Sequence, residues 1–218
     1  MTDDEAAGKP AIERLVVGPL ATNCYILKSG DEQAVIDPGG DAEAILAQSA
    51  ELGGTVKYVI DTHGHIDHVA ANGEVLKATG AELLIHETDA ALLTAPDKNL
   101  SNLMGVRVSS PAATRTLKEG DKVTVGDETL TVYHTPGHTR GGICLIAAEY
   151  AFTGDTLFVD SIGRVDFPGG SERQMQASLA RLETLLKREM MIYPGHGEPG
   201  TFGRALLVNP FLGGVAIA

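Results

Sequence analysis

The chain has 218 residues, of which 43% are hydrophobic and 21% are charged. These values are typical of a globular protein, so they argue against an intrinsically disordered chain and against a coiled-coil rod. The 29 acidic side chains outnumber the 17 basic ones and give a net charge of −12. Because this charge repels a phosphate backbone, it argues against nucleic acid as a partner.

The N-terminus and the two cysteines bear on the cellular compartment. Residues 3–5 are acidic where a secretory signal would need basic residues before an apolar run, so we expect no export. Cys24 and Cys144 lie in separate apolar runs, which predicts free thiols rather than a disulfide framework. The apolar stretch at residues 205–218 is too short and too broken by glycine and proline to span a bilayer. We therefore expect a cytoplasmic protein that has no membrane partner.

Apolar, β-branched runs alternate with helical patterns in the first half of the chain. Strands are expected at residues 12–17, 24–28, 34–36, 56–61 and 82–86. Two amphipathic helices are expected between the last three of these strands. The first opens at Asp41 and the second ends at Gly80.

The second half begins with a polar connection at residues 95–111, which is punctuated by proline and could cover a site. Further short strands are expected at residues 123–125, 130–134, 142–147, 150–153 and 191–193. The clearest helical pattern runs from Glu172 to Met190. This order predicts an α/β (α+β) fold with two mixed sheets between outer helices, in a single domain over residues 1–218.

The strongest chemical signal is a run of histidines and an aspartate directly after the strand at 56–61. His63, His65 and Asp67 alternate in sequence and so can point to one side, Gly64 lets the backbone bend, and His68 enters from the next helix. Imidazoles and carboxylates are ligands of Zn²⁺ and Fe²⁺. The lack of a nearby cysteine argues against a structural zinc site of the thiolate type.

Three later segments end a predicted strand with a further ligand type. They carry His138, Asp155 and His196, and each of these residues stands beside a glycine that lets the chain turn. Four strand-end segments that are far apart in sequence therefore predict one site, assembled at one edge of the sheets.

The combined motifs resemble those of the metallo-β-lactamase superfamily and, within it, of the glyoxalase II-like (hydroxyacylglutathione hydrolase-like) hydrolases. They are HxHxDH at residues 63–68, TPGHT at 135–139, GDTLF at 154–158 and PGHG at 194–197. The resemblance implies a four-layer αββα sandwich with two divalent metal ions. We expect these to be Zn²⁺, with Fe or Mn as alternatives. It further implies that one metal is held by His63, His65 and His138, the other by Asp67, His68 and His196, and that Asp155 bridges both.

Several polar residues lie near these motifs without belonging to the ligand set. Asp37 ends a strand at the same edge, and such a carboxylate orients a ligating imidazole by accepting its other N–H. Asp61 is left open between this role and a structural one. We place His134 in the second shell, with a structural role as the alternative, and we interpret His86 as structural.

The chemistry that this ligand set favours is hydrolysis. Two divalent metals lower the pKa of a bound water and polarise a carbonyl, so a metal-bridged hydroxide can attack an acyl carbon. Asp67 is the candidate catalytic residue because it could accept the proton of the nucleophile. A thioester such as a hydroxyacyl-thiol conjugate fits well, since a thiolate leaves with little acid catalysis. Lactones, other esters, phosphodiesters and β-lactams fit the same metals.

The surroundings of the site decide between substrates. By the resemblance, Arg164 matches a basic residue that contacts the glutathione moiety in longer relatives, so we expect it to bind the substrate, with a solvated loop charge as the alternative. Asp166 stands where those relatives have an aromatic residue, and we expect no C-terminal glutathione-binding helical domain. Both departures weaken the assignment to S-lactoylglutathione.

Two other functions remain open from the sequence. A persulfide dioxygenase shares this scaffold and uses a single iron held by three of the same positions. A binding or scaffold protein with a degenerate site would lack ligands, whereas all seven are present. The oligomeric state is left open.

Overall fold

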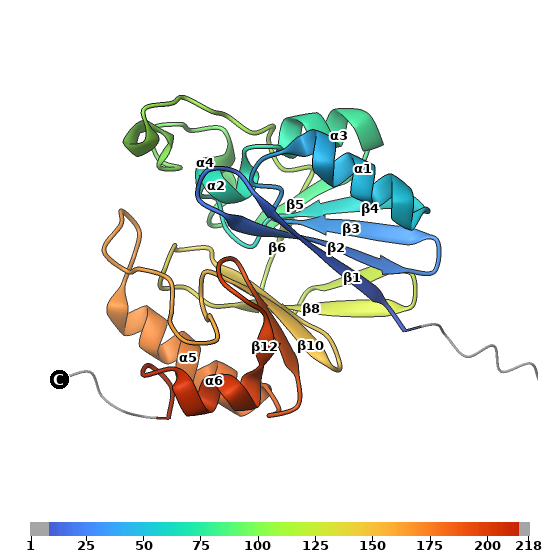
Figure 1. The fold of residues 1–218 in the computed structure, drawn as a ribbon. Coiled ribbons are helices and arrows are strands. Elements are labelled where there is room, and N and C mark those ends of the chain that lie inside the picture. The colour runs from blue at the N-terminus through green and yellow to red at the C-terminus, as the bar shows by residue number, and fades with distance from the viewer. Residues whose placement is uncertain (1–8, 214–218) are drawn as a thin grey trace, which may run out of the picture.

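The computed structural model describes residues 9–213, in which two six-stranded sheets pack face to face between outer helices (Figure 1). The acidic residues 3–5 and the end of the apolar stretch at 205–218 lie outside the described residues. Within residues 9–213, no helix is long and apolar enough to cross a membrane.

The first sheet has the strand order β1-β2-β3-β4-β5-β6. Its strands are β1 (Ala11–Val17), β2 (Thr22–Ser29), β3 (Glu32–Ile36), β4 (Thr55–Ile60), β5 (Glu82–His86) and β6 (Arg115–Leu117). β1, β2 and β3 are antiparallel, whereas β3, β4, β5 and β6 run parallel. The carboxyl ends of the four parallel strands therefore meet at one edge.

The second sheet has the order β12-β11-β10-β9-β8-β7. Its strands are β7 (Lys122–Val125), β8 (Glu128–His134), β9 (Ile143–Ile146), β10 (Tyr150–Gly154), β11 (Met191–Pro194) and β12 (Gly200–Thr201). β10 and β11 are parallel, and β8 and β10 are both antiparallel to β9. The carboxyl ends of β8, β10 and β11 thus share one edge of this sheet.

Helices cover the outer face of each sheet (Figure 1). The longer ones are α1 (Ala42–Leu52), α3 (Asn72–Thr79), α5 (Glu172–Leu185) and α6 (Phe202–Val208). The first two cover the first sheet and the other two cover the second. Short turns α2 (Ile66–Val69), α4 (Ala90–Leu93) and the 3₁₀ helix η1 (Ser101–Met104) lie in the loops.

Alternation along the strands divides the core into three layers. In β2, Tyr25 and Leu27 face the second sheet, whereas Cys24 and Ile26 face the helices α1 and α3. The second sheet contributes side chains to the same core, among them Phe152 of β10. A third layer lies between the second sheet and the helices α5 and α6. This arrangement confirms the predicted αββα sandwich.

The longest helix is shorter than its sequence pattern predicted. α5 ends at Leu185 rather than at Met190, because Leu186 is already extended. The chain then turns, and the carbonyls of Arg188 and Met190 accept hydrogen bonds from the first residues of α6. Contacts distant in sequence therefore override the helical pattern. The short strands β6 and β12 and the helix α6 were not predicted.

Phe152 provides a test of the core between the sheets. It is fully buried, and its ring centroid lies 5.4 Å from that of Tyr25 in the opposite sheet. Phe152→Ala is expected to lower the free energy of unfolding by about 3–5 kcal/mol, through lost burial and a cavity. Leu207→Ala is the control: Leu207 is 78% exposed, so the expected change is below about 0.5 kcal/mol. Urea titration measures both, and equal effects would contradict this packing.

Candidate metal centre

The HxHxDH motif lies in the loop that leaves the carboxyl end of β4. The first helical turn, α2, begins inside the motif at Ile66, and the backbone N–H of His68 donates to the carbonyl of His65. This turn carries His68 inward, as the sequence predicted. Gly64 is needed because its backbone passes against the side chain of Leu92, where a Cβ would overlap it.

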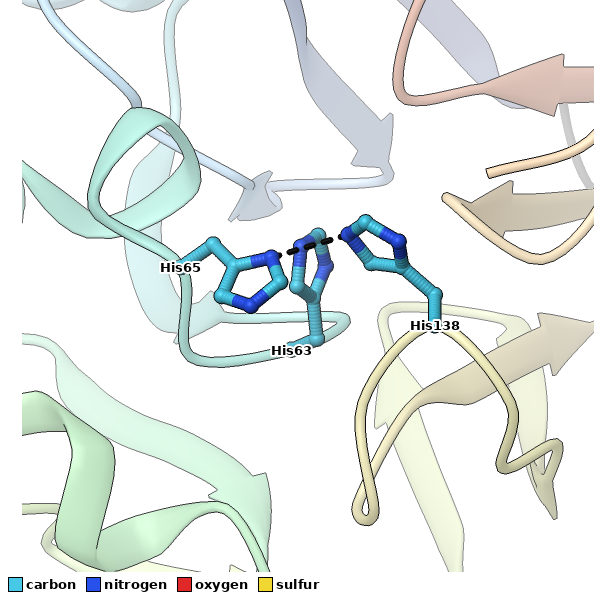
Figure 2. A group of neighbouring side chains, drawn as sticks. All are labelled: His63, His65 and His138. Carbon is cyan, nitrogen blue, oxygen red and sulfur yellow. Dashed lines mark hydrogen bonds between the residues drawn. The ribbon is translucent and has the colours of Figure 1, made fainter. Parts of the chain in front are cut away.

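Three histidines from two loops converge beside this motif. His63 and His65 come from the β4–α2 loop and His138 comes from the loop after β8 (Figure 2). They are 2%, 2% and 5% exposed, and one nitrogen of each lies within 4.8 Å of the others. Nδ1 of His65 is 2.8 Å from Nε2 of His138. The three rings therefore direct nitrogen atoms at one point.

A second group lies next to the first. Asp67, His68 and His196 also offer ligand atoms within 4.8 Å of one another. Nε2 of His196 lies 3.3 Å from Oδ2 of Asp67, and Nε2 of His68 lies 3.6 Å from the same oxygen. His196 reaches this place because it follows β11, the neighbour of β10.

Asp155 lies between the two groups. Its Oδ2 is 3.5 Å from Nε2 of His138 and 3.6 Å from Nε2 of His196, while its Oδ1 is 3.4 Å from Nε2 of His68. Gly195 makes this approach possible, because a Cβ at that position would overlap Oδ1 of Asp155. One carboxylate thus contacts histidines of both groups, as a bridging ligand would. The structure brings together all seven side chains that the sequence nominated.

Three of the ligand histidines have a polar neighbour at Nδ1. Nδ1 of His138 is 2.7 Å from the carbonyl of Arg164, which can only accept, so this nitrogen donates and Nε2 is the nitrogen that faces the other ligand candidates. Nδ1 of His68 lies 2.9 Å from Oδ2 of Asp37, and Nδ1 of His63 lies 3.2 Å from Oγ1 of Thr62. Such contacts orient each ring with the other nitrogen directed at the metal position.

Burial and charge set the protonation of the group. Burial lowers the pKa of His63 and of His65 well below the usual histidine value, and the neighbouring histidines lower it further. Both rings are therefore neutral and can act as ligands. Burial also opposes the charged form of His68, but the carboxylates of Asp155, Asp37 and Asp67 outweigh it and raise its pKa to about 10. The three carboxylates thus favour a positive charge at the position of His68.

The pKa of Asp67 responds to the same neighbours in the opposite sense. Burial would raise it, yet His68 and His196 hold it well below the usual range for a carboxyl group. Asp67 also accepts a hydrogen bond of 3.2 Å from Oγ1 of Thr22, which comes from the start of β2. Its carboxylate is therefore ionised at neutral pH.

The donor atoms fit a pair of divalent cations. Nε2 of His63, Nε2 of His68 and Oδ1 of Asp155 are buried and have no hydrogen-bond partner among the described residues. Leaving a buried polar atom unpaired costs about 1–3 kcal/mol, which coordination of a cation would offset. Imidazole nitrogens and carboxylate oxygens without a thiolate suit Zn²⁺, Fe²⁺ and Mn²⁺.

The acidic residues behind the ligands differ in their contacts. Asp37 lies against His68, as expected, and accepts hydrogen bonds of 2.7 Å from both the backbone N–H and Oγ1 of Thr62. Asp61 instead accepts a hydrogen bond of 2.8 Å from Nδ2 of Asn72. No hydrogen bond or ion pair joins Asp61 to a ligand side chain in residues 9–213, so the structural alternative holds for it.

His134 does not join the cluster. Its ring stacks on that of His86, with centroids 4.2 Å apart and planes at 9°, and its Nε2 lies 2.8 Å from the carbonyl of Arg140. It ends β8 before the loop turns inward to His138. The second-shell placement of His134 is thus not supported, and the structural alternative fits its contacts.

Asp89 supports the site, although no sequence motif singled it out. It follows β5 and is 1% exposed, and its carboxylate accepts the backbone N–H of Gly141 at 2.7 Å and of Gly64 at 3.2 Å. Gly64 separates the first two motif histidines, and Gly141 closes the loop of His138. One carboxylate therefore joins the two ligand loops. The only sequence signal was an acid shortly after a strand that ends at the same edge.

A cavity of about 360 Å³ opens over the two groups. His65, Asp67, His138, Asp155 and His196 line it. Most of its other lining side chains are apolar: Leu20, Ile66, Leu100, Leu103, Phe158, Ile162 and Phe167. Two of these come from the connection at 95–111, which therefore forms part of the wall. Arg164 also lines the cavity, where it was expected to contact a substrate.

Two ligand groups that share a carboxylate, set at one edge of an αββα sandwich below an open cavity, define a metal-dependent enzyme. Comparisons with known proteins agree. The family model described as metallo-β-lactamase superfamily matches residues 17–196. The chain belongs to the metallo-β-lactamase superfamily, which confirms the resemblance in the motifs, and it is a hydrolase of that superfamily.

Individual relatives support this assignment. Hydroxyacylglutathione hydrolase GloC of Haemophilus influenzae is 32% identical, over 92% of this chain and 97% of its own length. The crystal structure of BLEG-1, a B3 metallo-β-lactamase, has a TM-score of 0.89 at 32% identity, covering 94% of this chain and 100% of that one. The crystal structure of TTHA1623 in a di-iron-bound form has a TM-score of 0.83 at 32% identity, covering 92% of this chain and 100% of that one.

Asp155→Ala tests the shared carboxylate. Since Asp155 contacts histidines of both groups, the variant is expected to lose metal and at least about 99% of the activity while it remains folded by circular dichroism. Elemental analysis of the purified protein counts the metal ions. Asp160→Ala, at an exposed position of the same loop, is the control. Full activity in Asp155→Ala would exclude the bridging role.

Asp89→Asn tests the link between the ligand loops. An amide has one acceptor oxygen, so one of the two N–H groups loses its partner at a cost of about 1–3 kcal/mol. We expect metal affinity to fall by about 10-fold or more. Competition with a fluorescent chelator measures it, and Asp127→Asn, on an exposed turn, is the control. A dissociation constant equal to that of the wild type would show that Asp89 does not position the ligands.

Proposed function

We propose that this chain is a thioester hydrolase that cleaves hydroxyacyl-thiol conjugates, in the manner of a glyoxalase II-like enzyme. The observation that carries this choice is the lining of the cavity. Apart from the seven ligand candidates, Arg164 is the one titratable side chain that lines it among the described residues. An arginine stays protonated at neutral pH, so it is a poor general acid.

The lack of a general acid selects the leaving group. An amine or an alkoxide must be protonated as it departs, whereas a thiol has a pKa near 8.5 and leaves as the thiolate. A thioester can therefore be cleaved in this cavity without a further acid. The similarity to GloC, named a hydroxyacylglutathione hydrolase, supports the same class of substrate.

The side chains of the site divide the remaining work. Two divalent ions, Zn²⁺ before Fe or Mn, would supply an ionised water near neutral pH and polarise the thioester carbonyl. His63, His65 and His138 would hold one ion, and Asp67, His68 and His196 the other, with Asp155 between them. Asp67 lines the cavity, its carboxylate would accept the proton of the nucleophile, and the hydrogen bond from Thr22 to Oδ2 fixes its orientation.

The iron persulfide dioxygenase is the alternative reaction. It requires only three of the ligand positions, so it would leave the group of Asp67, His68 and His196 without an ion. The close approach of these three side chains to one another favours the two-metal hydrolase.

Metal content measured together with turnover decides between these reactions. We expect two metal ions per chain and hydrolysis of a lactoyl thioester, with no persulfide-dependent oxygen uptake and at least about 100-fold slower cleavage of a chromogenic cephalosporin. The Asp155→Ala variant is the negative control for each substrate. One iron per chain with oxygen uptake would establish the alternative, and efficient cleavage of the cephalosporin would instead identify a β-lactamase.

A further inference from the structure

The side chain of Arg164 does not present a free charge to the cavity. Its Nε and Nη2 atoms donate to Oδ1 and Oδ2 of Asp166 at 2.8 and 2.7 Å, a two-bond pairing of guanidinium and carboxylate. The guanidinium carbon also lies 4.1 Å from the ring centroid of Phe167. The arginine is thus held between an acid and an aromatic ring from its own loop.

This pairing partly neutralises the arginine that lines the cavity. Among the described lining residues, Arg164 is the only lysine or arginine. The side chains of Arg164 and Asp166 are 61% and 65% exposed, so the pair can open at little cost. Asp166 still lies two positions away along the same loop, and an incoming carboxylate must compete with it for the guanidinium. An anionic ligand therefore gains little from Arg164.

The rim of the cavity is apolar. Leu20, in the β1–β2 turn, is 49% exposed, and Leu103, in η1, is 70% exposed. Both line the cavity, together with Phe158, Ile162 and Phe167 from the loop after β10. Exposed leucines from two separate loops at one opening are a surface that an apolar ligand would cover.

We propose that the site selects conjugates whose thiol portion is apolar and uncharged, and that Asp166 determines this selectivity by neutralising Arg164. The inference rests on the proposed thioester function for its substrate class. It assigns the exclusion of anionic thiols, such as the tripeptide glutathione, to one residue. An anion is disfavoured by the paired arginine, and an apolar group is favoured by the leucine rim.

Non-hydrolysable thioethers test the selectivity separately from the reaction. The probes are S-hexylglutathione, which carries a net negative charge, and S-hexyl-N-acetylcysteamine, which is uncharged. Calorimetry on the metal-loaded protein gives their dissociation constants. Asp166→Asn frees Arg164 without changing the size of the side chain. We expect it to tighten S-hexylglutathione by about 3- to 5-fold and to change the uncharged thioether by less than about 2-fold.

Two further variants show whether the gain comes from the arginine. In the Arg164→Gln background, Asp166→Asn is expected to lose most of its effect on S-hexylglutathione, because no guanidinium remains to be freed. Asp127→Asn changes the net charge equally on an exposed turn at the opposite end of the sheets, and should leave both affinities unchanged.

The outcomes separate this inference from the proposed function. The expected pattern of thioether affinities without thioester hydrolysis would refute the function and keep the selectivity. Hydrolysis of thioesters with equal effects of Asp166→Asn on the two probes would refute the selectivity and keep the function. Failure of the metal-loaded protein to bind S-hexyl-N-acetylcysteamine at millimolar concentration would also overturn the selectivity.

Discussion

Seven ionisable side chains, five of them buried, meet at one place, and the rest of the structure is arranged to keep them there. Burial disfavours the charged forms of His63 and His65, and the neighbouring histidines lower the pKa of both rings further. Such a group persists only if the surrounding backbone fixes it. The fixed elements are strand ends: β4 in the first sheet and β8, β10 and β11 in the second each deliver a ligand to the same edge. Packing of the two sheets therefore determines the distance between the ligands that follow β4 and those that follow β8, β10 and β11.

Much of this could be predicted because the information is local. A run of alternating ligands after an apolar strand, and a glycine beside each later ligand, are visible in the sequence without any knowledge of the fold. The side chains that fix the loops are not visible in this way. Asp89 accepts hydrogen bonds from the backbone N–H groups of Gly64 and Gly141, which are far apart in sequence. Only the folded chain brings these two groups together. His134 misled for the same reason: it stands near His138 in sequence but turns toward His86.

The fold boundaries show the same division. Alternation within a strand follows from two faces with different neighbours, so the strands and the layers were predicted. The end of α5 was not, because it depends on hydrogen bonds that α6 makes to the turn after it. β6 and β12 are too short to carry a periodic signal of their own, and they form because a neighbouring strand offers an edge.

The segment that begins at Arg164 serves the cavity and the ligand set at once. Its side chain borders the cavity, while its backbone carbonyl holds Nδ1 of His138. A bound molecule that moved this segment would alter the orientation of His138 and so its affinity for a cation. Thermodynamic linkage then requires the cation to change the affinity for that molecule by the same factor. Loading with metal and occupancy of the cavity would then be two coupled equilibria, joined through the backbone carbonyl of Arg164.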